Sequence, residues 1–309
     1  MNSRAIKHIG MAAALSAAAM LTSCFTGVES TPKITAGDVK RANVRTSPES
    51  TFLADISGEP ASKWAIGKQF YVTDTKINSV FGTPSAQTGD LTGTMLTYTG
   101  SEPVTTIVGD PATDFIFTDR SGNRLRYRSV DATRSDTASF DVPFTIQMSV
   151  VEEVARRLNG KRYYVLTPIW YDRDGQSYTG RKFIPVEVAA VAPGNNVYPL
   201  SLLLRTDDGA AFILFMSVGS NLRAPRGFAT LFSFTDPREK YPQISDETWA
   251  NIIRGRVALG MTRAECRLAL GTPDDVIHRN DHNYLYERWN YDNGVYLVFR
   301  DDILENYRY

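Results

Sequence analysis

The sequence GKQFYV at residues 67–72 returns in a related form, GKRYYV, at residues 160–165. In both places a glycine and a lysine precede aromatic and β-branched residues, which is the composition of a short β-strand. A second pair follows in the same order, since Leu-Thr-Gly at residues 91–93 corresponds to Tyr-Thr-Gly at residues 178–180. This order indicates an internal repeat, with a chance match as the alternative because β sequences reuse these letters.

A hairpin completes the repeat in each copy. Its turn contains Gly122 in the first copy and Gly209, 87 residues later, in the second. A strand, a glycine turn and paired hairpins at this spacing predict two small SH3-like β modules, at residues 64–138 and 139–235. Between the repeated segments, the apolar spacing of residues 150–158 predicts a short helix that packs against the second module.

A third module is expected after the proline-containing linker at residues 236–242. Its first helix is capped by Ser245 or Asp246, since either side chain can accept from a free amide of the first turn. The helix has Trp249 on its apolar face and ends at Gly260.

A second helix follows directly. Thr262 and Glu265 have the spacing of a capping box, in which each side chain accepts a hydrogen bond from the other residue's amide. Gly271 supplies a left-handed stop and Pro273 prevents continuation. The remaining residues predict an antiparallel sheet of three strands, at residues 284–291, 295–300 and 303–309.

Four segments of this third module resemble one bacterial family. They read GRVALGMT, LGTP, ERW and VFRD and lie at residues 255–262, 270–273, 287–289 and 298–301. In this order they are similar to the SmpA/OmlA (BamE-like) family of small lipoproteins, over about 65 of the 309 residues.

The resemblance implies a BamE-like domain of two helices on a three-stranded sheet at residues 243–309. It also implies a non-catalytic accessory of β-barrel protein assembly at the outer membrane, with contacts to protein subunits and anionic lipid. In that family the domain lies close to its lipid anchor, whereas more than 200 residues intervene here. The fold class expected for the whole chain is α+β, mostly β.

The N-terminus has the features of a secreted, lipid-anchored protein. Arg4 and Lys7 precede an apolar run at residues 9–21, which is shorter than the roughly 20 residues of a membrane-spanning helix. Leu-Thr-Ser-Cys at residues 21–24 resembles the bacterial lipobox. The resemblance implies that Cys24 is acylated and becomes the first mature residue.

These features predict a signal peptide at residues 1–23 and a tether rich in Ser, Thr and Pro at residues 24–63. The expected location is the cell envelope of a Gram-negative bacterium, with Cys24 holding the protein on the bilayer. Residues 25–27 lack the aspartate linked with inner-membrane retention, which by analogy favours the outer membrane. The 34 basic and 34 acidic residues balance, so nucleic acid is not an expected partner.

Chemistry-bearing residues are sparse. Arg124, Arg126 and Arg128 alternate along one strand face and are the best candidates for contact with lipid phosphates or an anionic partner. Plain solubility is the alternative, because arginines on a half-wet strand are common. His278 and His282 have i, i+4 spacing but no third ligand, which favours a surface hairpin over a metal site.

No nucleophile has the neighbours that catalysis needs, and Cys266 is expected to be a buried small hydrophobe. We therefore predict no enzymatic activity, no cofactor and no metal. The predicted function is that of a membrane-anchored envelope lipoprotein that acts as a non-catalytic protein-interaction or scaffold factor, in outer-membrane protein assembly or envelope maintenance. The alternatives are a cell-wall or carbohydrate-binding protein and a proteinaceous inhibitor of a secreted enzyme.

Overall fold

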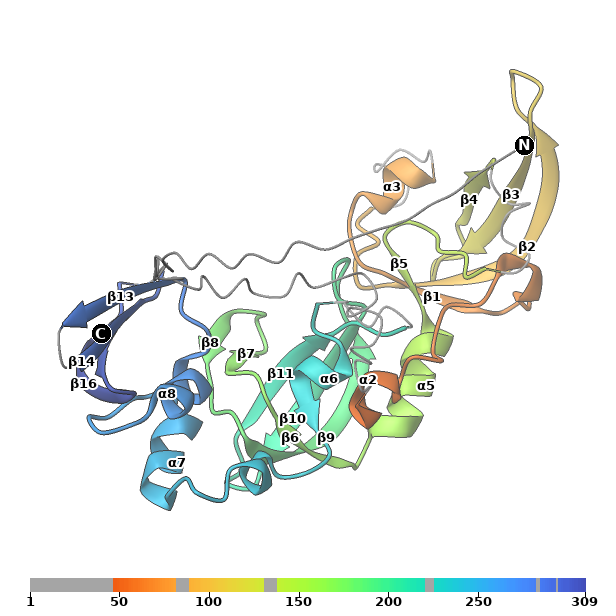
Figure 1. The fold of residues 1–309 in the computed structure, drawn as a ribbon. Helices are drawn as coiled ribbons and strands as arrows, with labels where there is room; N and C mark the ends of the chain where they lie inside the picture. The colour runs from red at the N-terminus through yellow and green to blue at the C-terminus, as the bar shows by residue number, and fades with distance from the viewer. Residues whose placement is uncertain (1–46, 82–88, 131–137, 220–224, 282–283, 293) are drawn as a thin grey trace, which may run out of the picture. The chain divides into compact units, whose positions relative to one another are not determined.

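The computed structural model describes residues 47–81, 89–130, 138–219, 225–281, 284–292 and 294–309. They form a mixed α+β fold that is mostly sheet, with three antiparallel sheets that follow one another along the chain (Figure 1). The expected signal peptide, Cys24 and the expected tether up to residue 46 lie outside the described residues.

Residues 47–63 pack as part of the fold, which corrects the expectation of a tether up to residue 63. Ser47 caps the short helix α2 (Pro48–Thr51), and the 3-10 helix η1 (Ala61–Lys63) follows. Between them, Leu53 and Ile56 are each 4% exposed and belong to the core of the second sheet. Burial of these two side chains offsets the entropy of ordering the segment, a term that composition alone does not reveal.

The first sheet has five strands in the order β4-β3-β2-β1-β5. Inward and outward residues alternate, so that in β4 Leu125 is buried while Arg124 and Arg126 are exposed. The inward side chains form an aromatic core in which Trp64 and Phe117 each contact Phe70. The bounds are β1 (Gln69–Val72), β2 (Met95–Thr105), β3 (Pro111–Thr118), β4 (Arg124–Ser129) and β5 (Thr145–Gln147), with the helix α3 (Ile77–Val80) after β1.

Strand β5 belongs to the first sheet, although the sequence boundary at residues 138 and 139 assigned it to the second module. It pairs with β1 through Phe70 and Gln147 and the two residue pairs that follow. This pairing joins segments more than 70 residues apart, so no local sequence signal reveals it.

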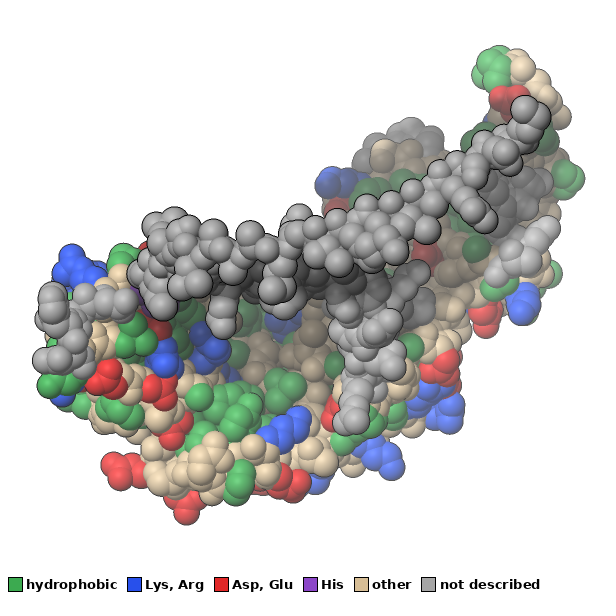
Figure 2. Space-filling model, in the orientation of Figure 1, with side chains coloured by type: hydrophobic (Ala, Val, Ile, Leu, Met, Phe, Trp, Pro, Cys, Tyr) green, Lys and Arg blue, Asp and Glu red, His purple; other side chains and the backbone are tan. Residues whose placement is uncertain are grey.

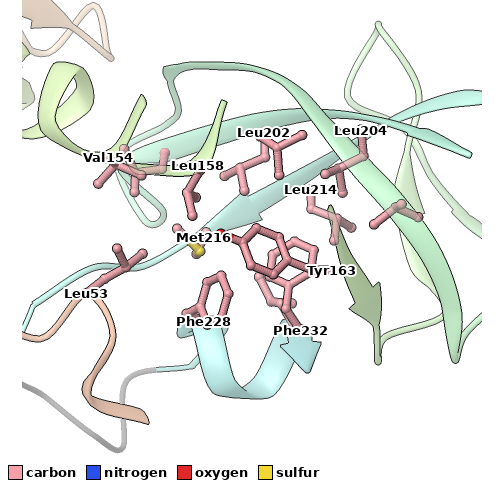
Figure 3. Packing of buried hydrophobic residues seen from close by; sticks show 14 of the residues in the cluster. Leu53, Val154, Leu158, Tyr163, Leu202, Leu204, Leu214, Met216, Phe228 and Phe232 are labelled. Atoms are coloured by element: carbon pink, nitrogen blue, oxygen red, sulfur yellow. The ribbon is translucent and has the colours of Figure 1, made fainter. Parts of the chain in front are cut away.

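The second sheet has seven strands in the order β12-β6-β9-β10-β11-β7-β8. The expected helix over residues 150–158 is confirmed as α5 (Met148–Leu158), whose Val154 and Leu158 are fully buried against this sheet. Figure 3 shows Leu158 pointing toward Met216 in this core, to which Val154 and Phe228 also belong. The bounds are β6 (Arg162–Val165), β7 (Ile169–Tyr171), β8 (Ser177–Thr179), β9 (Ile184–Pro193), β10 (Leu200–Thr206), β11 (Ala211–Met216) and β12 (Phe232–Ser233), with the helix α6 (Phe228–Leu231) before β12.

The two sheets have the same strand order once the β7–β8 hairpin is set aside, because β4-β3-β2-β1-β5 corresponds to β11-β10-β9-β6-β12. Their pairing register also agrees. Each of the six residue pairs that join β3 to β4 has a counterpart 87 positions later in β10 and β11. The pair of Asp114 with Arg128, for example, corresponds to that of Ser201 with Phe215.

Irregular features recur at the same points of the two sheets. The register skips Thr99 in β2 and Ala189 in β9, so both long strands bulge at equivalent positions. Gly122 and Gly209 both have a φ of 84° and both donate an amide to the carbonyl three residues earlier. A side chain is strained at this positive φ, which explains why both turns contain glycine.

The third sheet has the order β13-β14-β15-β16, with four strands where the sequence predicted three. The additional strand β13 pairs with β14 over seven residues and includes His278, so the expected hairpin at this histidine is confirmed. The bounds are β13 (Asp275–Asp281), β14 (Tyr284–Asn290), β15 (Tyr296–Arg300) and β16 (Ile303–Arg308).

Two helices precede this sheet, after the 3-10 turn η3 (Pro237–Lys240). In α7 (Asp246–Ile253), Ser245 is the N-cap, since its side chain accepts from the amide of Thr248. The helix ends at Ile253 and not at the expected Gly260, because Gly255 already takes a left-handed φ of 64°. The helix α8 (Arg263–Leu270) begins with the expected capping box of Thr262 and Glu265.

Candidate functional site

The three arginines predicted as anionic contacts lie together on the outer face of β4, and each has an acidic partner within the chain. Arg124 lies 2.9 Å from Glu102, Arg126 lies 3.4 Å from Asp114, and Arg128 lies 2.7 Å from Asp114. Their side chains are still about half exposed, at 57%, 52% and 46%. The strand thus presents accessible guanidinium groups whose charge is largely compensated.

Asp114 is the centre of this cluster and has no exposed side-chain surface. Arg128 binds it with two parallel hydrogen bonds, from Nε to Oδ1 at 2.7 Å and from Nη2 to Oδ2 at 2.9 Å. These hydrogen bonds, with the positive charges of Arg128 and Arg126, hold the pKa of Asp114 below its usual range. A buried carboxylate needs such partners, so a structural role accounts for Arg126 and Arg128.

The tip of the β2–β3 hairpin is an exposed apolar feature that the sequence analysis did not single out. Ile107 and Val108 occupy the turn and are 106% and 82% exposed. The next acidic residue, Asp110, has no ion pair with any residue that the structure describes. Residues 99–118 contain no Lys, Arg or His. Figure 2 shows apolar side chains beside an acidic one at the end of this hairpin.

A groove of about 470 Å³ lies where the second sheet meets α7. The two elements are joined by a hydrogen bond from the Lys182 amide to the Ile253 carbonyl at 3.1 Å, and both belong to one compact unit, residues 45–309. The apolar part of the groove lining consists of Ile184, Trp249, Ala250 and Ile253. The charged part consists of Arg181, Arg238, Asp246 and Arg254.

Trp249 is held in place by its neighbours. The ring of Phe183 lies 6.0 Å from it, that of Tyr241 lies 6.3 Å from it, and the Arg238 guanidinium lies 5.9 Å from its centroid. Aromatic edge contacts and a cation above a ring both favour this arrangement. The same tryptophan lines a second pocket of about 220 Å³ with Phe183 and Tyr241.

The groove contains guanidinium groups without a carboxylate partner. Arg181 lies 2.7 Å from Asp208 and is therefore neutralised. Arg238 and Arg254 have no ion pair among the described residues, and Arg254 only donates to the Ala250 carbonyl, at 3.1 Å. Asp246 is the one acidic group in the lining. The groove is suited to an apolar group with a carboxylate beside it.

Lys182, next to this groove, is buried with 7% of its surface exposed. Its ammonium lies 5.2 Å from the centroid of the Phe183 ring, and no carboxylate pairs with it among the described residues. Burial lowers the pKa of Lys182 to about 8. No local sequence pattern reveals this lysine, because its burial depends on contacts between distant segments.

None of the described residues forms a recognisable catalytic or metal-binding set. Cys266 is free and fully buried as expected, and burial raises the pKa of its thiol to about 12, which disfavours the reactive thiolate. His278 has its Nδ1 atom 3.4 Å from Glu287, while His282 lies outside the described residues. No cluster of three His, Cys, Asp or Glu suited to a metal occurs in the described ranges.

Glu287 has a structural role in the third module. It is 7% exposed, forms an ion pair with Arg263 and accepts from the Trp289 indole at 3.1 Å. Arg263 also pairs with Asp302, so α8, β14 and the turn before β16 are joined through one guanidinium. The ion pair and the indole hydrogen bond satisfy the buried carboxylate of Glu287, which gives it a role in holding these elements together.

Comparison of the chain with protein-family models, with curated proteins and with solved structures finds no match. Within the part of the chain that the structure describes, no helix is both long enough and apolar enough to cross a membrane.

Proposed function

We propose that this protein is a lipid-anchored lipoprotein of a Gram-negative cell envelope that acts by binding another protein and has no catalytic activity. The observation that carries the proposal is the apolar hairpin tip, where Ile107 and Val108 are held in solvent. Two adjacent apolar side chains on a projecting turn form a contiguous exposed patch of the kind that binds other proteins. Burying each aliphatic side chain contributes about 1.5–3 kcal/mol, enough for an anchor residue at the centre of an interface.

The charge around the tip favours a protein over a membrane as its partner. Segments that lie in a lipid interface carry Lys and Arg beside their apolar face, which attract anionic headgroups. Residues 99–118 carry none, and the unpaired Asp110 would be repelled. Arg124, Arg126 and Arg128 have acidic partners within the chain, but about half of each side chain stays exposed on the outer strand of the same sheet. These exposed parts are proposed to contact acidic groups of the partner.

The domain types of the proposal rest on strand order and on sequence resemblance. Each of the two β sheets contains a meander of three strands, β2-β3-β4 in the first and β9-β10-β11 in the second. The first strand, β1 or β6, pairs with one edge of this meander and on its other side with the last strand, β5 or β12. This shared order supports two SH3-like modules. Two helices before an antiparallel sheet support a BamE-like third module, with β13 as an additional strand. Small modules of this kind present loops to partners, so the binding function agrees with the architecture.

The anchor is proposed to be Cys24, with the outer membrane as the favoured location. Substituting Cys24→Ala should release the protein from the membrane fraction into the soluble envelope fraction. The measurement is fractionation together with metabolic labelling by a radioactive fatty acid. Membrane retention of the variant without label would contradict the lipoprotein assignment and leave the binding function to be judged separately.

The binding function is tested by removing the apolar tip. In the double variant Ile107→Ser, Val108→Ser, chemical crosslinking in cells followed by purification should lose the envelope protein that the unchanged chain recovers. The matched control is Val197→Ser, since Val197 is 68% exposed in the equivalent loop of the second sheet. The proposal is wrong if the unchanged chain is crosslinked to no protein, a second copy of itself included, or if the tip variant and the control recover the same partner equally.

A further inference from the structure

We propose that the 470 Å³ groove between the second sheet and α7, called the Trp249 groove below, receives the β2–β3 hairpin tip of a second copy. Anchored copies would then bind one another head to tail. The inference rests on the proposed function, because it takes the apolar tip as a protein-binding element and names its partner as this same chain.

The apolar parts of the two surfaces match. The tip presents two adjacent aliphatic side chains, Ile107 and Val108, on a turn closed by paired strands. The groove offers Ile184, Ile253 and the face of α7 at Ala250. Its volume of about 470 Å³ lies within the roughly 300–1,000 Å³ of pockets that enclose a small ligand, so a two-residue turn fits.

The charges also match. Asp110 follows the tip and has no ion pair within its own chain among the described residues. Arg238 and Arg254 line the groove and are likewise unpaired in the described ranges. Asp246 opposes the incoming carboxylate, but the two guanidinium groups outnumber it and can bind a carboxylate with two parallel hydrogen bonds. A neutral tip would gain only the apolar contact, and a basic tip would be repelled by the two guanidinium groups.

The geometry of such a contact determines its affinity and the kind of assembly that forms. Tip and groove are different surfaces, so the interface is heterologous and each added copy leaves one tip and one groove open. A turn of a few residues covers less than the roughly 1,000 Å² of a stable interface, which makes the contact weak in dilute solution. Copies anchored to one membrane share a high effective concentration, so assembly is expected there.

The test is a disulfide between the two surfaces in the full chain, expressed in the bacterial envelope. Val108→Cys combined with Ala250→Cys should give a ladder of dimers, trimers and larger species on non-reducing gels after mild oxidation. Cys266 stays in place because it is fully buried. The matched control combines Ala250→Cys with Ser121→Cys at the exposed turn after β3. Equal or weaker crosslinking of the proposed pair overturns the inference.

A charge exchange provides the second arm. Asp110→Arg on the copy that carries Val108→Cys should lower the crosslink by about fivefold or more, because an attraction becomes a repulsion. Mixing this copy with one that carries Ala250→Cys, Arg238→Asp and Arg254→Asp should restore it. Arg256→Asp, an exposed change outside the groove lining, should leave the crosslink unchanged. A crosslink insensitive to these reversals contradicts the proposed pairing.

The outcomes separate this inference from the proposed function. If position 108 crosslinks to a different envelope protein and never to position 250, the self-association is wrong while the binding function is supported. If position 108 crosslinks to no protein, both are wrong.

Discussion

The first and second sheets follow one plan and differ in what they present to the outside. Inward positions keep their character, because Leu125 in β4 corresponds to Phe212 in β11 and both are at most 2% exposed. Outward positions do not, since Arg126 and Arg128 correspond to Ile213 and Phe215. The alternation toward the core specifies the shared fold, and the outward residues are where the two sheets acquire separate roles.

The outer face of the second sheet is used within the chain itself. Phe215 contacts the ring of Tyr171 in β7 at 5.0 Å, and the β7–β8 hairpin pairs with β11. In the first sheet the same strand carries the arginines, and the β2–β3 hairpin extends two residue pairs beyond the point where β9 and β10 part at Leu200. The outer face of the second sheet is therefore covered by the chain's own β7–β8 hairpin, whereas the outer face of the first sheet stays exposed and is proposed to meet a partner.

The largest expected effect comes from the inward positions that the two sheets share. Phe212→Ala should lower the free energy of unfolding by about 3–5 kcal/mol, and Leu125→Ala by about 2–5 kcal/mol, because each leaves a cavity in a core. Phe212 also loses its stacking on Trp170, whose ring lies 3.6 Å away. Urea unfolding measures both. The exposed Arg124→Ala serves as the control and should stay within about 0.5 kcal/mol.

A smaller effect is expected at Asp114, where the sheets differ. Asp114→Asn should lower the free energy of unfolding by about 1–3 kcal/mol at pH 7, because it removes the charged partner of Arg128. Ser201, the counterpart of Asp114 in the second sheet, pairs with Phe215 and has no such partner. The pKa of Asp114 is lowered on folding, so its stabilisation is present above the unfolded pKa of about 4 and is lost as pH falls through the folded pKa.

The sign of this pH dependence can be checked by urea unfolding between pH 7 and pH 2.5. The difference in free energy of unfolding between the unchanged protein and Asp114→Asn should shrink below about pH 4. Ser201→Ala provides the matched change in the second sheet and should have a pH-independent effect within about 0.5 kcal/mol. A deficit for Asp114→Asn that persists at pH 2.5 would show that shape and not charge accounts for it.

The smallest expected effect concerns Lys182 beside the second sheet. The folded pKa of about 8 lies below that of an exposed lysine, so the folded state binds fewer protons than the unfolded chain between about pH 8 and pH 10.5 and stability rises with pH there. Lys182→Met should therefore stabilise the protein by about 1–2 kcal/mol at pH 7, with the gain fading above pH 8. Exposed Lys161→Met is the control, and an equal gain there would contradict the assignment.

Local sequence patterns predicted the elements whose causes are local. Three such elements are the strands at residues 67–72 and 160–165, the helix α5 and the capping box of Thr262. The pattern that predicts each of them lies within a few neighbouring residues. Strand β13 was not counted in the predicted sheet, although a hairpin was expected at His278. Polar residues near its end have turn propensity, and its pairing with β14 overrides that propensity.

The candidate site was largely inaccessible to such patterns. Arg124, Arg126 and Arg128 could be found as an alternating charged face, but their neutralisation requires the register that places Asp114 opposite Arg128. The groove joins Arg181 to Arg254 across separate modules, so no spacing reveals it. Ile107 and Val108 did leave a signal, since two apolar residues stand at a turn where polar residues are usual.

The most direct test of the central claim places a photoactivated crosslinking amino acid at position 108 in the first sheet and, separately, at the equivalent loop position 197 in the second. After irradiation of intact cells, we expect a discrete protein adduct at position 108 and none above background at position 197. Adducts of equal yield at both positions, or a lipid adduct alone at position 108, would contradict it.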